Sequence, residues 1–399
     1  MSHPIPRRSF LAHAAFTAAT TPWVLTTIAS AAEAPSRLKK AAVVGHTGHG
    51  DYGHGLDELF QNRPGIELVA VADADPAGLE RAAAKLKPRR RYASYREMLE
   101  RERPELVSIA PRQADQHRDM VMAALQSGAH VFCEKPFTTN PADADELLAL
   151  AAQKQLKIAV SHQMRMSPVI VKLHSALKEG LIGELLEMRG YGKQDSRAGG
   201  EDLMVLGTHI FDLMRLFAGD PLSCAARVLW KGRDIALADA RSVKDDVGLL
   251  SGDEVTAEFS FGRGVNASFT SRAALRETIG AWGLELIGSK GSARINANIP
   301  PRVFLLKSSG WRNEGRTDQW QPFAPDAEPL SNSSAFGQAN ARLVDDWLQA
   351  ISTGKEPECS GRNAAWTIEM VMAVYWASLR QQRVRFPLQD RSHPLAGRR

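Results

Sequence analysis

Two patterns of apolar positions follow each other along the chain, and the change falls near residue 160. Before that point, short and almost uninterrupted apolar runs alternate with longer amphipathic stretches. Such runs, bounded by turn residues, indicate strands buried on both faces, and the stretches between them indicate helices. The runs that we interpret as strands are residues 38–45, 67–72, 106–110, 129–133 and 156–160. This alternation predicts an α/β domain with an open parallel sheet over residues 35–160.

After residue 160 the pattern alternates residue by residue, first at 255–261 and again at 265–270. Gly262-Arg263-Gly264 separates these two segments, so we expect a hairpin. The other elements that we expect are a strand and turn at 284–291 and amphipathic helices at 340–351 and 364–379. Together they predict a second domain over residues 161–399, an α+β domain with an open, mostly antiparallel sheet.

The composition narrows the class of protein. A chain of 399 residues is too long for one ordinary core, which agrees with two domains. The net charge of +5 is spread along the sequence without a basic stripe interleaved with aromatics, so we expect no nucleic-acid partner. An anionic sugar or a polyanionic surface remains compatible with this charge. The cysteines have neither disulfide-framework nor zinc-site spacing, and we expect no metal.

The N-terminus carries Arg7-Arg8, followed by a weakly apolar run to about Ala29 and by small residues up to Ala34. We interpret residues 1–34 as a twin-arginine signal peptide, which predicts a periplasmic or otherwise exported protein. A membrane anchor and a chance arginine pair are the alternatives, although Pro22 and the Ala- and Thr-rich composition make a poor anchor. Because this route carries folded proteins, we expect a tightly held cofactor, and no stable membrane insertion after cleavage.

A glycine-rich turn follows the first predicted strand. Gly45 fits the tight turn, and Gly48 and Gly50 fit close approach of a pyrophosphate, while Thr47 stands where a glycine is usual. A second frame that starts at Gly48 also matches, but it begins late. We expect a helix after the turn, with its first N–H groups facing the phosphates. The histidines that we interpret as loop or substrate-mouth residues, rather than metal ligands, are His46, His49 and His54.

Asp73 ends the second predicted strand, where a carboxylate can accept both ribose hydroxyls of a dinucleotide. The same carboxylate would repel a 2′-phosphate, and no arginine directly follows it. The sequence therefore predicts a Rossmann domain that binds NAD rather than NADP. We expect Asp75 to cap a helix that begins at Pro76.

Glu134-Lys135-Pro136 follows the apolar run 129–133. Ligands of open α/β sheets gather at the carboxyl ends of strands, so a lysine here can reach a nicotinamide ring and a substrate hydroxyl together. Such a tripeptide alone is typical of a solvated turn. The glycine-rich turn upstream favours a catalytic Lys135, with Glu134 beside it at the cofactor.

Short motifs at 43–45, 69–73, 109–111, 133–136 and 207–212 occur in that order. By their order and spacing the chain resembles, from about residue 38 to 385, the glucose–fructose oxidoreductase, inositol dehydrogenase and rhizopine-catabolism (Gfo/Idh/MocA) family. The resemblance implies that the loop with Pro111 packs along the cofactor and that residues 161–165 line the active site. His162 and Arg165 are then candidate substrate contacts, with a structural role as the alternative. The resemblance also implies that the second domain, residues 161–399, binds substrate and forms a homo-oligomer, a dimer or tetramer.

The segment 193–212 carries a second group of candidates. Gly199-Gly200 should break the chain before a helix whose acidic first turn, Glu201 and Asp202, suits the helix dipole. On that helix Asp202, His209 and Asp212 share one face by three- and four-residue spacing. His209 matches the family's active-site histidine, and an imidazole suits proton abstraction from a carbinol.

The chain departs from the family at Val205, where many dehydrogenases carry an aspartate four residues before this histidine. Either Asp202 or Glu201 supplies the carboxylate from one turn earlier, or the chemistry is not plain dehydrogenation. The polar side chains that we assign to substrate binding, with a solvated loop as the alternative, are Lys193, Asp195, Arg197 and Glu201.

The combined prediction is an exported, NAD-dependent oxidoreductase that acts on a sugar, polyol or glycoside. Lys135 and His209 share proton transfer while a ring carbon gives a hydride to the nicotinamide. One alternative is an NAD-dependent enzyme that cleaves glycosides by transient oxidation, elimination and re-reduction. The other is a non-catalytic sugar-binding protein on the same fold.

Overall fold

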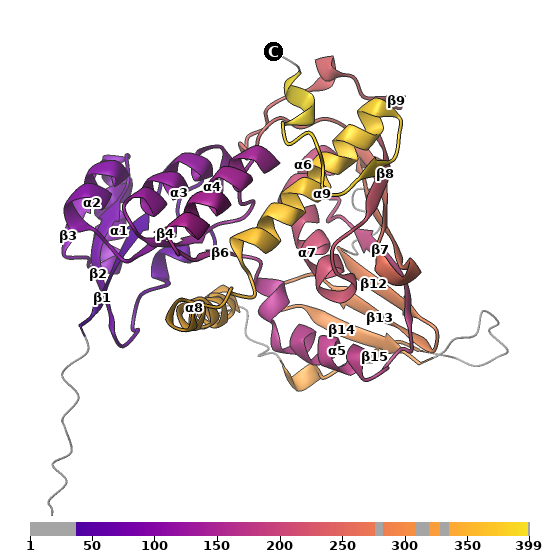
Figure 1. The fold of residues 1–399 in the computed structure, drawn as a ribbon, viewed down its shortest axis with the longest axis horizontal. Coiled ribbons are helices and arrows are strands. Elements are labelled where there is room, and N and C mark those ends of the chain that lie inside the picture. The colour runs from indigo at the N-terminus through magenta and orange to yellow at the C-terminus, as the bar shows by residue number, and fades with distance from the viewer. Residues whose placement is uncertain (1–36, 276–281, 308–318, 328–334, 398–399) are drawn as a thin grey trace, which may run out of the picture. The chain divides into compact units, whose positions relative to one another are not determined.

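The structure is a computed structural model that describes residues 37–275, 282–307, 319–327 and 335–397 (Figure 1). The predicted signal peptide, residues 1–34, lies outside these ranges. The described strands form two sheets, one of six strands and one of ten. No helix within these ranges is both long and apolar enough to cross a membrane.

The first sheet is parallel, with the strand order β3-β2-β1-β4-β5-β6. Its strands are β1 (Lys39–Val44), β2 (Ile66–Ala72), β3 (Arg90–Tyr92), β4 (Leu106–Ile109), β5 (His130–Cys133) and β6 (Ile158–Val160). The order reverses between β1 and β4, where a doubly wound sheet places its ligand. The predicted Rossmann domain is confirmed. Strand β3 was not predicted, because it lies in the basic stretch after α1 and has no apolar run.

The helices of this part are α1 (Pro76–Leu86), α2 (Tyr95–Glu102), α3 (His117–Gln126) and α4 (Pro141–Gln153). Helix α1 begins as predicted: the Asp75 carboxylate accepts a hydrogen bond from the Gly78 N–H at 2.6 Å, and Pro76 is its first residue. Asn140 caps α4 in the same way, accepting from the Asp143 N–H at 3.0 Å.

The helix predicted after the glycine-rich turn is absent between β1 and β2. This stretch is irregular and contains only one short 3₁₀ turn, Leu56–Glu58. The reason is the spacing of its glycines, because Gly48, Gly50, Gly53 and Gly55 all have positive φ, between 60° and 87°. A right-handed helix cannot include such residues. A phosphate at this turn therefore meets single backbone N–H groups and no helix N-terminus.

A helix from far along the sequence covers the face that the missing helix would have covered. Alternate residues of β1 separate into two clusters, one packed with helices α2 to α4 and the other around Ala41 and Val43. The second cluster contains Trp347 of α8 (Ala335–Thr353), which is fully buried beside Phe60 and Phe132. Figure 1 shows α8, coloured as a late segment, beside the Rossmann strands. The C-terminal part of the chain thus completes the core of the first domain.

The second sheet has the order β15-β14-β13-β12-β7-β11-β10-β8-β16, with β9 paired to β8. Its main strands are β7 (Leu185–Tyr191), β8 (Ser223–Trp230), β10 (Glu254–Ser260), β11 (Asn266–Arg272), β12 (Gly283–Gly288), β13 (Gly291–Asn296) and β14 (Arg302–Leu306). The short strands are β9 (Arg233–Asp234), β15 (Gln321–Pro322) and β16 (Val384–Arg385). All its pairs are antiparallel except β7 with β11. The predicted hairpin (β10–β11) and the mostly antiparallel sheet are confirmed.

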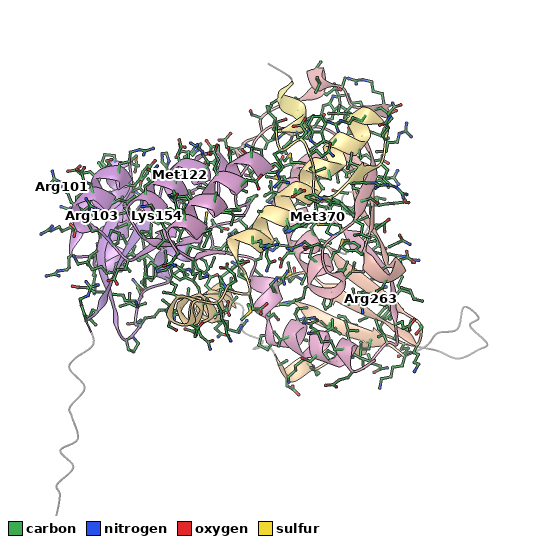
Figure 2. The ribbon with its side chains drawn as sticks, in the orientation of Figure 1. Arg101, Arg103, Met122, Lys154, Arg263 and Met370 are labelled. Atoms are coloured by element: carbon green, nitrogen blue, oxygen red, sulfur yellow. The ribbon has the colours of Figure 1, made fainter. Side chains whose placement is uncertain are left out.

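Helices α7 (Gly207–Ala218) and α9 (Gly361–Arg380) pack on this sheet, and α6 (Gly200–Val205) precedes α7. Helix α9 is almost continuously buried, and Met370 (labelled in Figure 2) and Met372 belong to the core. Trp366 and Trp376 are only half-buried, with the guanidinium groups of Arg215 and Arg380 over their rings. Arg263, also labelled in Figure 2, is exposed at the β10–β11 turn. Helix α5 (Pro168–Lys178) follows the first domain.

Candidate active site

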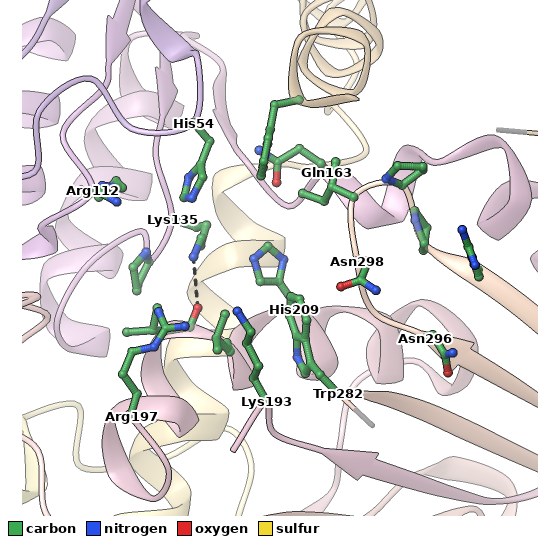
Figure 3. Close-up of a pocket in the computed structure, with 18 of the residues that line it drawn as sticks. His54, Arg112, Lys135, Gln163, Lys193, Arg197, His209, Trp282, Asn296 and Asn298 are labelled. Atoms are coloured by element: carbon green, nitrogen blue, oxygen red, sulfur yellow. Dashed lines mark hydrogen bonds between the residues drawn. The ribbon is translucent and has the colours of Figure 1, made fainter. Parts of the chain in front are cut away.

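A cavity of about 1190 Å³ lies at the carboxyl ends of the Rossmann strands and reaches the second sheet (Figure 3). Its Rossmann wall includes Gly48, Gly50, His54, Arg112 and Lys135. Its other wall includes Lys193, Arg197, Val205, His209, Lys244, Trp282, Asn296 and Asn298. A volume of this size accommodates a sugar-sized ligand together with part of a dinucleotide.

Lys135 lies directly after β5, and its side chain is 6% exposed. The ammonium group donates to the backbone carbonyl of Val205 at 3.2 Å, the dashed contact in Figure 3. Burial lowers the pKa of Lys135; the Glu134 carboxylate acts against this shift, and Arg197 adds to it. The family's aspartate is missing at position 205, so a backbone carbonyl partners the lysine where that carboxylate would be expected.

Glu134 is fully buried behind the cavity wall and does not line the cavity. Its carboxylate accepts from the Lys135 N–H at 2.6 Å and from the Ser161 hydroxyl at 2.7 Å, and it also bonds the His54 ring. Burial would raise the pKa of Glu134, but His54, Lys135 and Ser161 outweigh it and hold the pKa at about 2. The carboxylate predicted to touch the cofactor therefore positions Lys135 and His54, which do line the cavity.

His209 of α7 lines the cavity opposite Lys135 (Figure 3). Its ring is edge-on to His162, with centroids 5.4 Å apart, and lies near Trp282 at 5.8 Å. Burial lowers the pKa of His209 well below its ordinary value, and the nearby Lys135 adds to this. Burial also lowers the pKa of His162 to about 4. Both rings are therefore neutral near pH 7 and can accept a proton.

Three buried polar atoms around this point have no hydrogen-bond partner within the described residues: His209 Nδ1, His162 Nε2 and Trp282 Nε1. An unsatisfied buried donor or acceptor is costly, typically about 1–3 kcal/mol. Two of the three belong to cavity-lining side chains. A hydroxylated ligand would supply the missing partners, which fits a sugar or a polyol.

The helix predicted over residues 200–212 is broken at Leu206 into α6 and α7. His209 and Asp212 lie on α7 as predicted, but Asp202 lies on α6, so its predicted place on the same helix is wrong. The Asp202 carboxylate is fully buried and accepts from the Lys193 N–H at 3.1 Å and the Ser271 hydroxyl at 2.5 Å. Neither Asp202 nor Glu201 lines the cavity, so the structure does not bring a substitute carboxylate to Lys135. Asp202 instead anchors the loop that carries Lys193.

Arg165 and Asp212 form a buried ion pair, 7% and 1% exposed. The guanidinium reaches both carboxylate oxygens, and its Nη2 also donates to the Asp212 carbonyl at 2.9 Å. Arg165 does not line the cavity. The structure therefore contradicts the predicted substrate contact of Arg165 and supports the structural alternative.

The polar side chains predicted to bind substrate at residues 193–197 divide into those that line the cavity and one that does not. Lys193 and Arg197 line the cavity, and Figure 3 shows both pointing toward the region of Lys135. Asp195 does not line it, but lies behind them: Arg197 donates to Asp195 at 2.6 Å, and the Lys193 ammonium is 3.5 Å away. These contacts with Arg197 hold the pKa of Asp195 at about 2.

The glycine-rich turn fits a dinucleotide. A Cβ on Gly50 would lie 2.6 Å from the Arg112 nitrogen, whereas Gly48 has no atom within 4 Å of its Cβ position, so its backbone is open to a ligand. Asp73 directly follows β2, at the predicted strand end, and its carboxylate accepts from the Thr47 hydroxyl at 2.7 Å. The Thr47 N–H also donates to this carboxylate, at 3.1 Å, so Asp73 holds the glycine-rich turn at the end of β2.

The rest of the predicted cofactor loop is part of the scaffold. Gly45 lies under the ring of Tyr52, which a Cβ would meet at 2.1 Å. The Pro111 carbonyl accepts from His117 at 2.7 Å, and the other ring nitrogen of His117 is 2.8 Å from the Pro136 carbonyl. His117 thus links the loops after β4 and β5, which hold Arg112 and Lys135.

Sequence reasoning did not single out several cavity residues: Gln163, Lys244, Trp282, Asn296 and Asn298. Asn296 ends β13, and Asn298 follows two residues later, the spacing of one face of a strand. These two amides at a strand end could have been recognised in the sequence as candidate ligand contacts. Trp282 and Lys244 gave no local signal, because only the fold brings them to the cavity.

Two sequence models of known families match the chain. One, described as "Oxidoreductase family, NAD-binding Rossmann fold", matches residues 39–162, and the C-terminal α/β domain of the same family matches residues 187–386. D-apiose dehydrogenase of Paraburkholderia graminis is 28% identical over 324 residues, covering 78% of this chain and 80% of that relative. Levoglucosan dehydrogenase of Pseudarthrobacter phenanthrenivorans is 24% identical over 315 residues, covering 71% of this chain and 80% of the relative.

The fold is also similar to solved structures. Levoglucosan dehydrogenase in complex with NADH and levoglucosan superposes with a TM-score of 0.70 at 18% identity, covering 88% of this chain and 100% of the other. An Agrobacterium radiobacter oxidoreductase in complex with NAD⁺, L-tartaric acid and magnesium gives 0.67 at 19% identity, with coverages of 87% and 98%.

A Rossmann sheet, an open glycine turn and a buried lysine beside a neutral histidine define an NAD-dependent oxidoreductase with a separate substrate domain. The chain belongs to the Gfo/Idh/MocA oxidoreductase family, whose two domain models together span residues 39–386 apart from the segment between them.

Proposed function

We propose that the protein oxidises a carbinol carbon of a sugar, a polyol or a glycoside, with NAD as hydride acceptor. The observation that carries this proposal is the convergence of Lys135 and His209 on one cavity beside the open backbone of Gly48. The amides of Asn296 and Asn298 on the far wall suit hydroxyl groups. The dehydrogenases for D-apiose and levoglucosan among the relatives support this substrate class.

Bound NAD supplies the nicotinamide carbon that takes up a hydride. The chain supplies the proton chemistry: burial lowers the pKa of Lys135, and in its neutral form this amine accepts the proton of the substrate hydroxyl. The carbonyl of Val205 orients that amine. Neutral His209 hydrogen-bonds the same hydroxyl, and the indole of Trp282 lies edge-on beside it.

The absence of a carboxylate at position 205 favours a second candidate, glycoside cleavage through transient oxidation. In that reaction the ketone acidifies the neighbouring C–H, a second base removes this proton, the aglycone leaves with a proton, water adds to the resulting double bond, and the hydride returns to the ketone. Neutral His209, which lines the cavity, would provide the second base, and His162 lies edge-on to it outside the cavity wall. Release of the aglycone without net reduction of NAD would identify this reaction, whereas a keto-sugar formed together with NADH would identify the dehydrogenase.

We also propose that the protein is exported in its folded state with NAD tightly bound. The arginine pair Arg7-Arg8 and the small residues up to Ala34 support this. The test is cell fractionation of the full chain beside an Arg7→Lys, Arg8→Lys variant. Retention of the variant in the cytoplasm supports export by the twin-arginine route, whereas identical distributions of the two proteins refute it.

A homo-oligomer, dimer or tetramer, also remains a proposal. Its support is the resemblance alone, since the family often pairs subunits through the open sheet. Light scattering of the purified protein gives the mass directly, and a mass equal to one chain of 43.6 kDa would refute it.

The first experiment for the main proposal is to denature the purified protein and measure nicotinamide dinucleotide in the supernatant. Close to one NAD per chain supports the bound cofactor, and sugars and glycosides are then screened with and without added NAD. Lys135→Met should retain NAD but lose turnover. A protein that neither releases nor binds NAD or NADP would overturn the proposed function.

A further inference from the structure

The cationic side chains of the cavity are its main charge feature. Besides the catalytic Lys135, five of them line it, Arg112, Lys193, Arg197, Lys244 and Arg302, against two carboxylates, Asp51 and Asp245. Even with Asp195 behind the wall, the positive charge is in excess. Each charge placed in a partly dehydrated cavity needs a counter-charge, so the surplus indicates that the natural ligands are anionic.

The excess of positive charge is not confined to the end of the cavity where the dinucleotide phosphates would bind. Arg112 stands at the glycine-rich turn, where it pairs with Asp51 at 3.7 Å. Lys193 and Arg197 come from the segment after β7, and Lys244 comes from the loop between Arg241 and Leu250, whose backbones bond each other. Three cations therefore reach the cavity from these two segments of the substrate half, and Arg302 of β14 adds a fourth.

These three cations are only partly neutralised. Asp195 pairs with both Lys193 and Arg197, and Asp245 lies 3.9 Å from Arg197. Lys244 is exposed, and no carboxylate within the described residues forms an ion pair with it. The group thus offers at least one uncompensated charge at the mouth of the cavity.

The cations Lys193 and Arg197 lie close to the catalytic end of the cavity. Arg197 is among the charges that lower the pKa of Lys135, after burial, and Figure 3 shows Arg197 and Lys193 pointing to the space in front of Lys135 and His209. The opposite wall carries the neutral amides of Asn296 and Asn298, together with Arg302, the register partner of Asn296. The cations thus lie mainly on the side of Lys193 and Arg197, which matches a molecule with a negative group on that side and hydroxyl groups toward the amides.

We propose that the substrate is a sugar acid, a hydroxylated ring or chain with a carboxylate that Lys193, Arg197 and Lys244 bind. This rests on the proposed dehydrogenase function and gives its substrate class. Carboxylate–guanidinium and carboxylate–ammonium contacts are charge-assisted, so they discriminate strongly against a neutral analogue of the same size.

The test is a calorimetric titration of the NAD-loaded protein with D-galacturonate, with its methyl ester and with D-galactose, and with the matching glucose series. The ester keeps the size of the acid and removes the charge. We expect at least one of the acids to bind roughly tenfold or more tightly than its ester, and added salt to reduce this preference. Equal binding of acid and ester in both series, or no binding of either acid, would overturn the proposal.

Substitutions show which side chains produce the preference for the acid over its ester. Lys244→Gln changes an exposed side chain without an ion pair, so its fold is preserved, and the double variant Arg197→Gln, Lys244→Gln should abolish the preference for the acid. Lys172→Gln, an exposed lysine of α5 that does not line the cavity, is the matched control and should keep it.

The dissociation constant of NAD is measured on the same variants. A double variant that loses NAD but still prefers the acid would assign these cations to the dinucleotide and refute the sugar-acid site. A protein that binds no NAD at all would defeat the proposed function separately, because the acid and its ester can then be titrated into the cofactor-free protein.

Discussion

Substitution of Arg165 distinguishes a structural role of this residue from a substrate-binding role in one experiment. Arg165→Met keeps most of the side-chain volume but removes the guanidinium that meets Asp212 through Nε and Nη2, at 2.8–3.1 Å. The carboxylate of Asp212, 1% exposed, is then left in the core without a counter-charge. Breaking a buried pair from one side typically costs about 3–5 kcal/mol. We expect a loss of that order in the free energy of unfolding, with KM unchanged because Arg165 does not line the cavity.

The assay is urea denaturation followed by tryptophan fluorescence, beside steady-state kinetics. Burial alone raises the pKa of a carboxyl, and in the native protein Arg165 more than offsets this for Asp212. Without Arg165 the pKa of Asp212 should rise, so the defect should shrink as the pH falls and the carboxyl takes up a proton. The double variant Arg165→Met, Asp212→Leu removes both charges and should recover most of the loss. An Arg165→Met protein of unaltered stability with a greatly raised KM would refute this reasoning and restore the substrate contact.

Three further predictions follow from the site. Lys135→Met should lower kcat by a factor of about 10²–10⁴, and the kcat of the native enzyme should rise with pH through a Lys135 pKa below 10.5; a flat profile contradicts the role of the amine. His162 has a folded pKa of about 4 and an ordinary value of 6.5, so the stability present above pH 6.5 should be lost as the pH falls toward 4, by up to about 3 kcal/mol. His162→Phe should flatten that part of a pH–stability curve, and an unchanged curve counts against burial as the cause. Asp73→Ser should reduce the preference for NAD over NADP by roughly tenfold or more, measured as the ratio of dissociation constants, because it removes the carboxylate that repels a 2′-phosphate.

The strands of the Rossmann sheet could be predicted because burial on both faces leaves a purely local mark, a continuous apolar run such as residues 129–133. The positions of Lys135 and Asp73 followed, since each is tied to the end of such a strand. The helix after β1 was predicted by analogy with the glycine-rich motif of dinucleotide-binding domains. It does not form, because Gly48, Gly50 and Gly53 have positive φ angles.

The side-chain partners could not be predicted in this way. Three- and four-residue spacing placed Asp202 beside His209, but the break at Leu206 turns the two apart. Arg165 and His162 looked equivalent in sequence, three residues apart, yet one is used in an ion pair and the other keeps a free ring nitrogen near the cavity. Such outcomes depend on residues distant in sequence, Asp212 and His209, and only the fold reveals them.

The burial of Trp347 under the Rossmann sheet sets the order in which the molecule matures. A ribosome delivers the chain from its N-terminus, and early domains usually fold as they emerge. Here the sheet face around Ala41 and Val43 has no complete cover until α8 has been synthesised, some three hundred residues later. The nascent first half therefore exposes an apolar face until α8 is synthesised. Because β1 leads into the glycine-rich turn, we expect NAD to bind stably only after α8 has packed, which under the export that we propose means before translocation.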